Sequence, residues 1–168
     1  AVSDYARKAL TFGLGEKFQN KVTVVHHGVS AIYQHDKSVV RKNFLLAVSD
    51  IYVQKNLHTL IRALASIREA YPDIILKIAG KAIDEGYLQE LYEVLDQTQM
   101  RGAVEFMGEQ NTHELLTLYQ ECKLFVFPST VETFGNPLVE AMACAAPIIS
   151  SNTAAMPEVL GEAGHYFN

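Results

Sequence analysis

The stretch VFPSTVETFGNPLVEAMACAAPIISS, residues 126–151, decides the fold of this chain. It overlaps an apolar run, residues 124–127, that is long enough for one buried strand. A polar loop follows over residues 128–135. Asn136 then stands directly before Pro137, which pairs a preferred N-cap residue with the residue preferred at the first helical position. We therefore predict a strand, a loop and then a helix capped by Asn136.

The predicted helix is apolar at every position of residues 138–146 except Glu140. A helix that is apolar on all faces is normally buried, and Pro147 ends it because proline cannot continue the hydrogen-bond ladder. Residues 148–150 then indicate the next strand. Since burying a carboxylate without partners is costly, Glu140 needs compensating partners.

A second carboxylate, Glu132, lies in the loop before this helix, eight residues ahead of Glu140. Two carboxylates thus flank one helix N-terminus at the carboxyl end of a strand, where open α/β sheets bind ligands. Phosphate on the helix N–H groups and hydroxyls on the carboxylates would describe a nucleotide sugar. The alternative is a first-turn Glu140 that stabilises the helix dipole and an unrelated Glu132, and spacing alone leaves both open.

The residues from Glu132 to Glu140, ETFGNPLVE, resemble the E-x7-E signature of the family 4 retaining glycosyltransferases. Four flanking blocks resemble the same family in the same order: Phe127-Pro128-Ser129, Glu140-Ala141-Met142-Ala143 with Pro147, Ser151-Asn152 with Pro157-Glu158-Val159, and Gly161-Glu162-Ala163-Gly164. The resemblance runs from about residue 21 to residue 168. It implies one half of a two-domain GT-B type enzyme, the half that binds the donor.

The resemblance also implies roles for individual residues. Glu132, which would hold hydroxyls of the transferred sugar, and Lys55, on the donor diphosphate, would be the catalytic pair. Further donor-binding positions implied by it are Glu140, Phe134, Gly135, Asn136, Pro137, Leu138, Val139, Gly80 and Met107. Glu140 would accept hydrogen bonds from the ribose diol. It implies no metal and no cofactor, since the nucleoside diphosphate sugar is the donor substrate.

One loop departs from the family pattern. The family usually shows G-R-x-x-x-x-K-G here, whereas this chain has Ser49 and Asp50 before the matching Lys55. An acidic group beside a diphosphate is repulsive, so another cation substitutes, or donor affinity is low, or activity is lost. Lys81, after the next strand, is a candidate for the missing positive charge, although a lysine after a strand is most often simply exposed.

From residue 44 onward, strand and helix patterns alternate with short connections, which predicts a parallel sheet with helices on both faces. Predicted strands cover residues 21–26, 44–48, 74–79, 104–107, 124–127, 148–150 and 165–167, and predicted helices cover 3–14, 57–71, 87–98, 112–122, 137–146 and 156–160. The fold class is therefore α/β, a Rossmann-like doubly wound sheet. We expect residues 1–30 to be the tail of a missing N-terminal domain, 31–43 a linker and 44–168 the nucleotide-sugar-binding domain.

Composition bounds the function further. The 168 residues carry a net charge of −5, which argues against a nucleic-acid-binding surface. No run approaches the roughly 20 apolar residues that span a bilayer. The two cysteines, Cys122 and Cys144, suggest core thiols and a reducing cytoplasm. A peripheral association of the full-length protein with the inner face of the membrane stays open, and no pair of the six histidines has convincing metal-ligand spacing.

The sequence therefore predicts a retaining glycosyltransferase that moves a hexose from a nucleoside diphosphate sugar to a saccharide or lipid-linked acceptor, as in polysaccharide assembly. The acceptor would bind the missing N-terminal domain, so this chain alone should bind donor without transferring sugar. An alternative is a non-catalytic relative that uses the fold as a binding or scaffold domain, for which Asp50 is the best support. A dinucleotide-dependent oxidoreductase is disfavoured because the chain lacks the Gly-x-Gly-x-x-Gly fingerprint.

Overall fold

The computed structural model describes residues 1–168 apart from the side chain of Glu16. Its sheet contains the strands β1 (Phe44–Val48), β2 (Ile75–Ala79), β3 (Val104–Gly108), β4 (Leu124–Phe127), β5 (Ile148–Ser151) and β6 (His165–Phe167). The helices are α1 (Asp4–Thr11), α2 (Glu16–Gln19), α3 (Leu57–Ala70), α4 (Glu85–Thr98), α5 (Thr112–Glu121), α6 (Asn136–Ala143) and α7 (Met156–Leu160). Two single 3₁₀ turns, η1 (Val53–Lys55) and η2 (Arg101–Ala103), complete these elements.

The strands lie in the order β3-β2-β1-β4-β5-β6, and every neighbouring pair is parallel. The predicted doubly wound α/β sheet is therefore confirmed. The chain winds outward from β1 to β3 and then returns to the other side of β1 with β4. The strand order thus reverses between β1 and β4, and the crevice at their carboxyl ends is where such sheets bind ligands.

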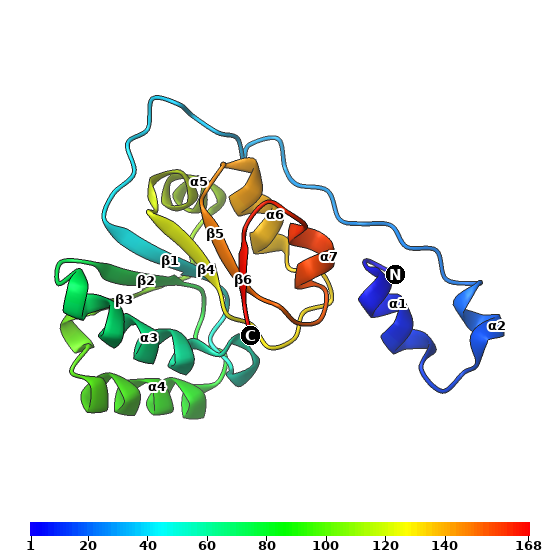
Figure 1. Cartoon of the computed structure of the whole chain (residues 1–168), viewed down its shortest axis with the longest axis horizontal. Coiled ribbons are helices and arrows are strands. Elements are labelled where there is room, and N and C mark those ends of the chain that lie inside the picture. Colours follow the sequence, from blue (N-terminus) through cyan, green and yellow to red (C-terminus); the bar gives the residue numbers. More distant parts are fainter.

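The central strand β1 is buried along its whole length, and its side chains alternate between two hydrophobic cores. Phe44, Leu46 and Val48 join a core with α5, α6 and α7, while Leu45 and Ala47 join another with α3 and α4. Figure 1 shows α3 and α4 on one side of the sheet and α5 and α6 on the other. A strand covered on both faces is continuously apolar, which explains the sequence of β1.

The first 30 residues differ from their prediction. Helix α1 ends at Thr11, because Gly13 takes a left-handed φ of 78°. Leu10 and Phe12, which fall within the predicted helix over residues 3–14, are 64% and 88% exposed. Residues 21–26 form no strand, since an extended segment needs a neighbour for its ladder and Val25 donates only to the carbonyl of Ala1. Figure 1 shows α1 and α2 at the end of a long extended segment.

Both ends of α6 also differ from the prediction. Gly135, with a φ of 92°, occupies the N-cap position, and Asn136 is the first helical residue and makes no side-chain cap. The helix stops at Ala143 rather than at residue 146, because Ala145 is left-handed with a φ of 50°. A left-handed residue after the helix end is a common C-terminal signal that is hard to foresee at an alanine.

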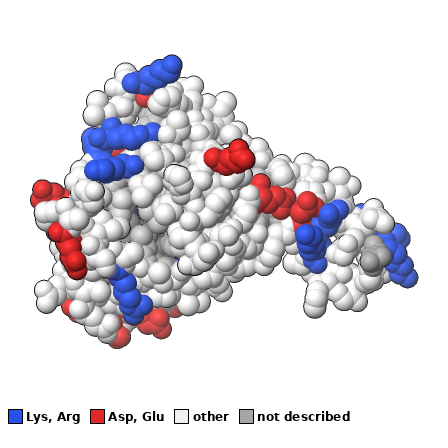
Figure 2. Space-filling view, in the orientation of Figure 1, with Lys and Arg blue, Asp and Glu red and all other residues white. Residues whose placement is uncertain are grey.

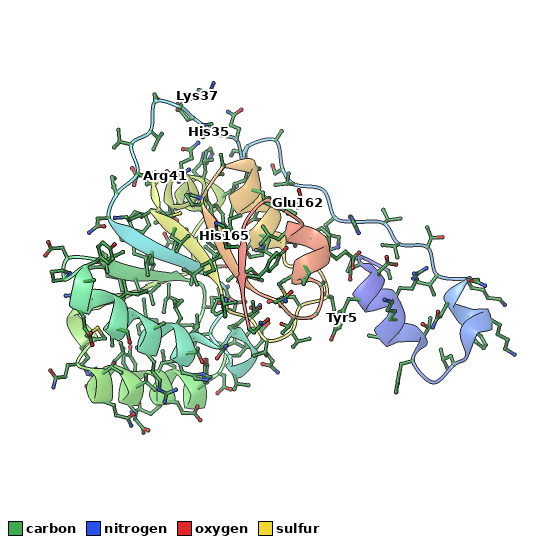
Figure 3. All side chains as sticks on the ribbon, in the orientation of Figure 1. Tyr5, His35, Lys37, Arg41, Glu162 and His165 are labelled. Carbon is green, nitrogen blue, oxygen red and sulfur yellow. The ribbon has the colours of Figure 1, made fainter. Side chains whose placement is uncertain are left out.

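The segment between residues 31 and 43 is tied to the sheet domain by Arg41 (Figure 3). Its guanidinium donates to the carbonyl of Cys122 at 2.9 Å and of Gln120 at 3.1 Å, at the end of α5. The same group donates to the carbonyl of Ala145 at 2.6 Å, after α6. A cation therefore satisfies the free carbonyls at two helix C-termini at once.

No helix in the described part of the chain is both long enough and apolar enough to cross a membrane. Cys122 and Cys144 are free and fully buried, as expected of core thiols. Burial raises the pKa of Cys122 to about 12 and that of Cys144 to about 11. Both thiols therefore stay protonated at neutral pH.

Candidate functional site

The loops that follow β1 and β4 meet at the point where the strand order reverses. The N–H of Thr130 donates to the carbonyl of Gln54 at 2.8 Å, and the side-chain amide of Asn56 donates to the carbonyl of Pro128 at 3.2 Å. These contacts join segments more than 70 positions apart. The parallel pairing of β1 with β4 brings them together, because it places the carboxyl ends of both strands at one edge.

An ion pair between Lys55 and Glu132 closes this junction. The ammonium lies 2.5 Å from Oε1 of the carboxylate, and the two side chains are only 11% and 16% exposed. The ammonium also lies over the rings of Tyr52, at 5.0 Å from the centroid, and Phe127, at 6.0 Å. Burial by itself would lower the pKa of Lys55, but the hydrogen bond and charge of Glu132, followed by those of Tyr52, leave it raised. The lysine is therefore held in its charged form.

The start of α6 lies in the same loop. A Cβ at Gly135 would lie 3.3 Å from both Leu138 and Phe127, and its left-handed backbone favours glycine in any case. In the described chain, the N–H groups of Phe134 and Gly135 donate to no protein acceptor. Together with the helix dipole, free N–H groups at a helix start favour an anion.

The side chains around the start of α6 have structural partners. Phe134 is buried, and its ring centroid lies 4.9 Å from that of His27. Nδ1 of His27 makes a 2.8 Å hydrogen bond with Oδ1 of Asn136. Leu138 is fully buried in the core, while Pro137 and Val139 are partly exposed. For Phe134, the backbone N–H is therefore the part available to a ligand, whereas the N–H of Leu138 already donates to the carbonyl of Gly135 at 2.9 Å.

Glu140 lies one turn further into α6 and is half-buried. Its Oε2 accepts a 2.8 Å hydrogen bond from the phenol of Tyr119 on α5. Burial raises the pKa of Glu140, and the bond from Tyr119 opposes that rise. The two carboxylates that the sequence places around this helix thus have different partners, a lysine for Glu132 and a phenol for Glu140.

The carboxyl ends of β1, β2 and β3 enclose a cavity of about 180 Å³, with Ser49, Asp50, Gly80 and Glu109 among its walls. A Cβ at Gly80 would fall 2.0 Å from the carbonyl oxygen of Ser49, so only glycine fits there. The hydroxyl of Ser49 is buried and has no hydrogen-bond partner in the described chain. The carbonyl of Met107, also at this edge, accepts a 2.8 Å bond from the side-chain amide of Gln110.

Asp50, which stands where the family usually has arginine, and Lys81, the candidate replacement cation, each have a partner within the protein. Oδ1 of Asp50 accepts a 2.9 Å hydrogen bond from the backbone N–H of Lys81. The Lys81 ammonium pairs with Glu109 at 2.9 Å, and this hydrogen bond raises its pKa. The positive charge of Lys81 is thus directed to Glu109 at the exposed rim.

Three site-forming residues were not assigned a site role from the sequence. His27 contacts Asn136, Tyr119 holds Glu140, and Tyr33 lies edge-on against Tyr119 with ring centroids 5.9 Å apart. The only signal for Tyr119 is a hydroxyl on an otherwise apolar helix face. Nothing in the sequence indicates which carboxylate such a hydroxyl would meet.

The remaining surface carries mixed charge. On the face shown in Figure 2, basic and acidic side chains of the described residues lie in separate small groups and form no continuous basic surface. Among the described residues, no group of three or more His, Cys, Asp or Glu is placed to hold a metal ion.

The structure is thus an α/β domain with a lysine, two carboxylates and a helix N-terminus at the sheet edge where the strand order reverses. Comparison with known proteins assigns the family. Residues 31–167 match the family described as glycosyl transferases group 1, and the chain belongs to this family.

Three relatives from enteric bacteria have similar sequences. The serotype-specific mannosyltransferase WbdA of Escherichia coli is 30% identical over 95% of this chain and 19% of its own length. O-antigen chain mannosyltransferase B of the same species is 30% identical over 73% of this chain and 32% of its own. The O-antigen chain mannosyltransferase RfbU of Salmonella typhimurium is 30% identical over 88% of this chain and 40% of its own length. The chain thus spans less than half the length of each.

Solved structures share the fold. HepE of Anabaena, in complex with UDP and glucose, matches all of this chain and 48% of its own, with a TM-score of 0.87 and 22% identity. WaaG, a glycosyltransferase involved in lipopolysaccharide biosynthesis, matches 99% of this chain and 48% of its own, with a TM-score of 0.82 and 16% identity. At these identities the likeness shows the fold, which is half of a GT-B glycosyltransferase.

Proposed function

We propose that this chain is the donor-binding half of a retaining glycosyltransferase, which moves a hexose from a nucleoside diphosphate sugar to a saccharide or lipid-linked acceptor. The observation that carries the proposal is the buried pair of Lys55 and Glu132 beside the free N–H groups at the start of α6. The site combines one cation, unpaired amide donors and carboxylate acceptors. A diphosphate joined to a polyhydroxylated sugar needs all three.

The proposed chemistry follows from the charge that develops. As the bond between the anomeric carbon and the diphosphate oxygen breaks, negative charge grows on the departing diphosphate and positive charge on the sugar ring. Lys55 and the N–H groups of Phe134 and Gly135 stabilise the diphosphate, since fixed donors aimed at developing charge lower the barrier most. Glu132 accepts hydrogen bonds from sugar hydroxyls, and Glu140 accepts them from the ribose diol.

The ion pair has a second use in this proposal. With no donor bound, Lys55 and Glu132 neutralise one another in a place where either charge alone would be costly. Both side chains are thereby held near the positions in which they meet the donor. Pre-ordering a charged group in this way reduces the entropy lost on binding.

The sugar acceptor is expected to bind a different domain. We infer that residues 1–30 continue a preceding domain, that residues 31–43 are the linker, and that the preceding domain binds the acceptor. This chain by itself is then expected to bind donor nucleotide and to transfer no sugar. Polysaccharide assembly is the proposed setting, supported by the O-antigen mannosyltransferases among the relatives.

Calorimetry with UDP, GDP and ADP tests the proposal. The 168-residue chain should bind at least one of them. Lys55→Met should weaken that binding at least tenfold, because a charge-assisted contact to phosphate contributes about 1.5–3 kcal/mol. Lys77→Met is the matched control, since Lys77 also pairs with a carboxylate but lies within β2. No heat from any nucleotide, with circular dichroism showing a folded chain, would refute the site.

A non-catalytic binding or scaffold domain is the second candidate. The observation that favours it is Asp50, whose carboxylate is exposed at the ligand edge where the family usually has arginine. On this alternative the chain keeps the fold but does not bind a diphosphate. An arginine restored at this position separates the two candidates.

A further inference from the structure

The phenol of Tyr119 is fixed before any ligand arrives. Its side chain is fully buried, and its ring packs edge-on against Phe125 and Tyr33, with ring centroids 5.4 Å and 5.9 Å away. The hydroxyl points at Glu140, whose Oε2 accepts its hydrogen bond at 2.8 Å. Because aromatic neighbours hold the ring on two sides, the hydroxyl oxygen is kept beside Glu140.

The carboxylate of Glu140 is bound on one oxygen only. Oε2 takes the phenol, while Oε1 has no protein partner in the described chain and keeps contact with solvent. Tyr119, Tyr33 and Cys144 are the titratable groups that sense the charge of Glu140. None of these three is a cation, so the neutral phenol is the side chain that compensates the half-buried carboxylate.

The pKa shifts of Tyr119 and Tyr33 agree with a hydrogen bond donated by Tyr119 to Glu140. Burial, followed by the charge of Glu140, raises the pKa of Tyr119 well above its ordinary value. Burial also raises the pKa of Tyr33 to about 12, with the charge of Glu140 as the second cause. Tyr119 therefore stays protonated throughout the neutral range and donates a hydrogen bond to the carboxylate.

We propose that Tyr119 is a positioning residue for donor binding: its phenol orients Glu140 so that the free Oε1 meets the ribose hydroxyls of the nucleoside diphosphate. This inference rests on the proposed function, because it assigns the acceptor of the ribose diol. The competing explanation is a purely structural tie between α5 and α6. A structural tie would affect all nucleotides equally, whereas a positioning role affects only those with ribose hydroxyls.

Tyr119→Phe tests the inference, because it removes only the hydroxyl. The probes are UDP, GDP and ADP, each compared by calorimetry with its 2′,3′-dideoxy form. The unchanged chain should bind the ribonucleotide roughly tenfold more tightly than the dideoxy form, as expected for hydrogen bonds to a charged group. In Tyr119→Phe this ratio should fall to about threefold or less, with dideoxy affinity unchanged, since the variant lacks the hydrogen bond that orients Glu140.

Tyr87→Phe is the matched control. Tyr87 is also buried and its hydroxyl forms a 2.9 Å hydrogen bond with Nδ1 of His58, but it lies on α4 in the other hydrophobic core. This variant should keep the full ratio. A second readout, the titration of ¹³C-labelled glutamate carboxyls, should show the pKa of Glu140 rising in Tyr119→Phe and not in Tyr87→Phe.

The outcomes separate the inference from the function on which it rests. Equal loss of both nucleotide forms in Tyr119→Phe, or an unchanged ratio, overturns the positioning role. If Glu140→Gln then still reduces the ratio, the proposed function stands without it. An unchanged chain that binds no nucleotide, or binds both forms equally, overturns the role of Glu140 and the inference together.

Discussion

The ammonium of Lys55 lies 2.5 Å from the carboxylate of Glu132, although 77 positions separate the two residues in the chain. They meet because β1 and β4 are neighbours in the sheet while lying far apart in the sequence. Each residue follows its strand into the crevice where the strand order reverses. The pair is therefore a product of the winding of the sheet, and it lies at the kind of crevice where open α/β sheets generally bind ligands.

Removing one member of this ion pair should lower the stability of the protein strongly, whereas replacing both members with apolar residues should not. We expect Lys55→Ala to lower the free energy of unfolding by about 3 kcal/mol, because it leaves Glu132 buried and uncompensated. The double variant Lys55→Met with Glu132→Leu should recover most of that loss and still bind nucleotide at least tenfold more weakly than the unchanged chain. Urea denaturation and calorimetry provide the two measurements. A double variant as unstable as Lys55→Ala would contradict this account.

Replacing Glu140 should make the protein more stable and weaken its nucleotide binding. Burial raises the pKa of Glu140 above its ordinary 4.5, and the bond from Tyr119 only partly offsets this. A raised pKa means that its contribution to stability is complete below pH 4.5 and is lost as pH rises through the folded-state value. Glu140→Gln should therefore raise the melting temperature at pH 7, remove this part of the pH dependence, and weaken nucleotide binding.

Thermal denaturation at pH 5 and pH 8, with Glu132→Gln as the comparison, measures this effect. The benefit of Glu140→Gln should be larger at the higher pH. A variant that collapses instead would show that Glu140 is needed for the fold. Because Glu140 lies beyond the first turn of α6, that need would come from its bond to Tyr119 and not from the helix dipole expected of a first-turn residue.

Asp50→Arg should strengthen diphosphate binding. Asp50 is exposed, so an arginine fits without repacking. The change removes a negative charge and adds a positive one at the surface, which is expected to contribute about 1 kcal/mol, or roughly fivefold in affinity. The gain should shrink as salt rises, because exposed charges are screened. Asp73→Arg, an equally exposed change in the turn between α3 and β2, controls for net charge. No gain over that control would favour the binding or scaffold alternative.

Arg41 should be a stability residue with no part in nucleotide binding. Arg41→Met removes a charged donor from the carbonyls of Gln120, Cys122 and Ala145, and we expect a loss of about 2 kcal/mol. Arg62→Met, an exposed change on α3, should stay within about 0.5 kcal/mol. Urea denaturation compares them. A loss of nucleotide affinity without a loss of stability in Arg41→Met would place residues 31–43 in the site itself.

Much of the sheet domain was predictable because its signals are local. Apolar runs such as that of β1, and helical spacing such as that of α3, reflect burial along one element. Where a local rule failed, a backbone conformation decided: Gly135 rather than Asn136 begins α6, and a left-handed Ala145 ends it. The strand expected over residues 21–26 failed for another reason, since pairing needs a neighbour that its own sequence does not specify.

By itself, the sequence determined the α/β alternation, the family resemblance and which loops follow the carboxyl ends of the strands, because each depends on residues close together in the chain. Only the tertiary structure decided partners: Lys55 with Glu132, Tyr119 with Glu140, and Lys81 with Glu109 instead of the site. Each pairing depends on which strands and helices lie side by side. That arrangement is set by the packing of both cores across the whole sheet, and no short stretch of sequence contains it.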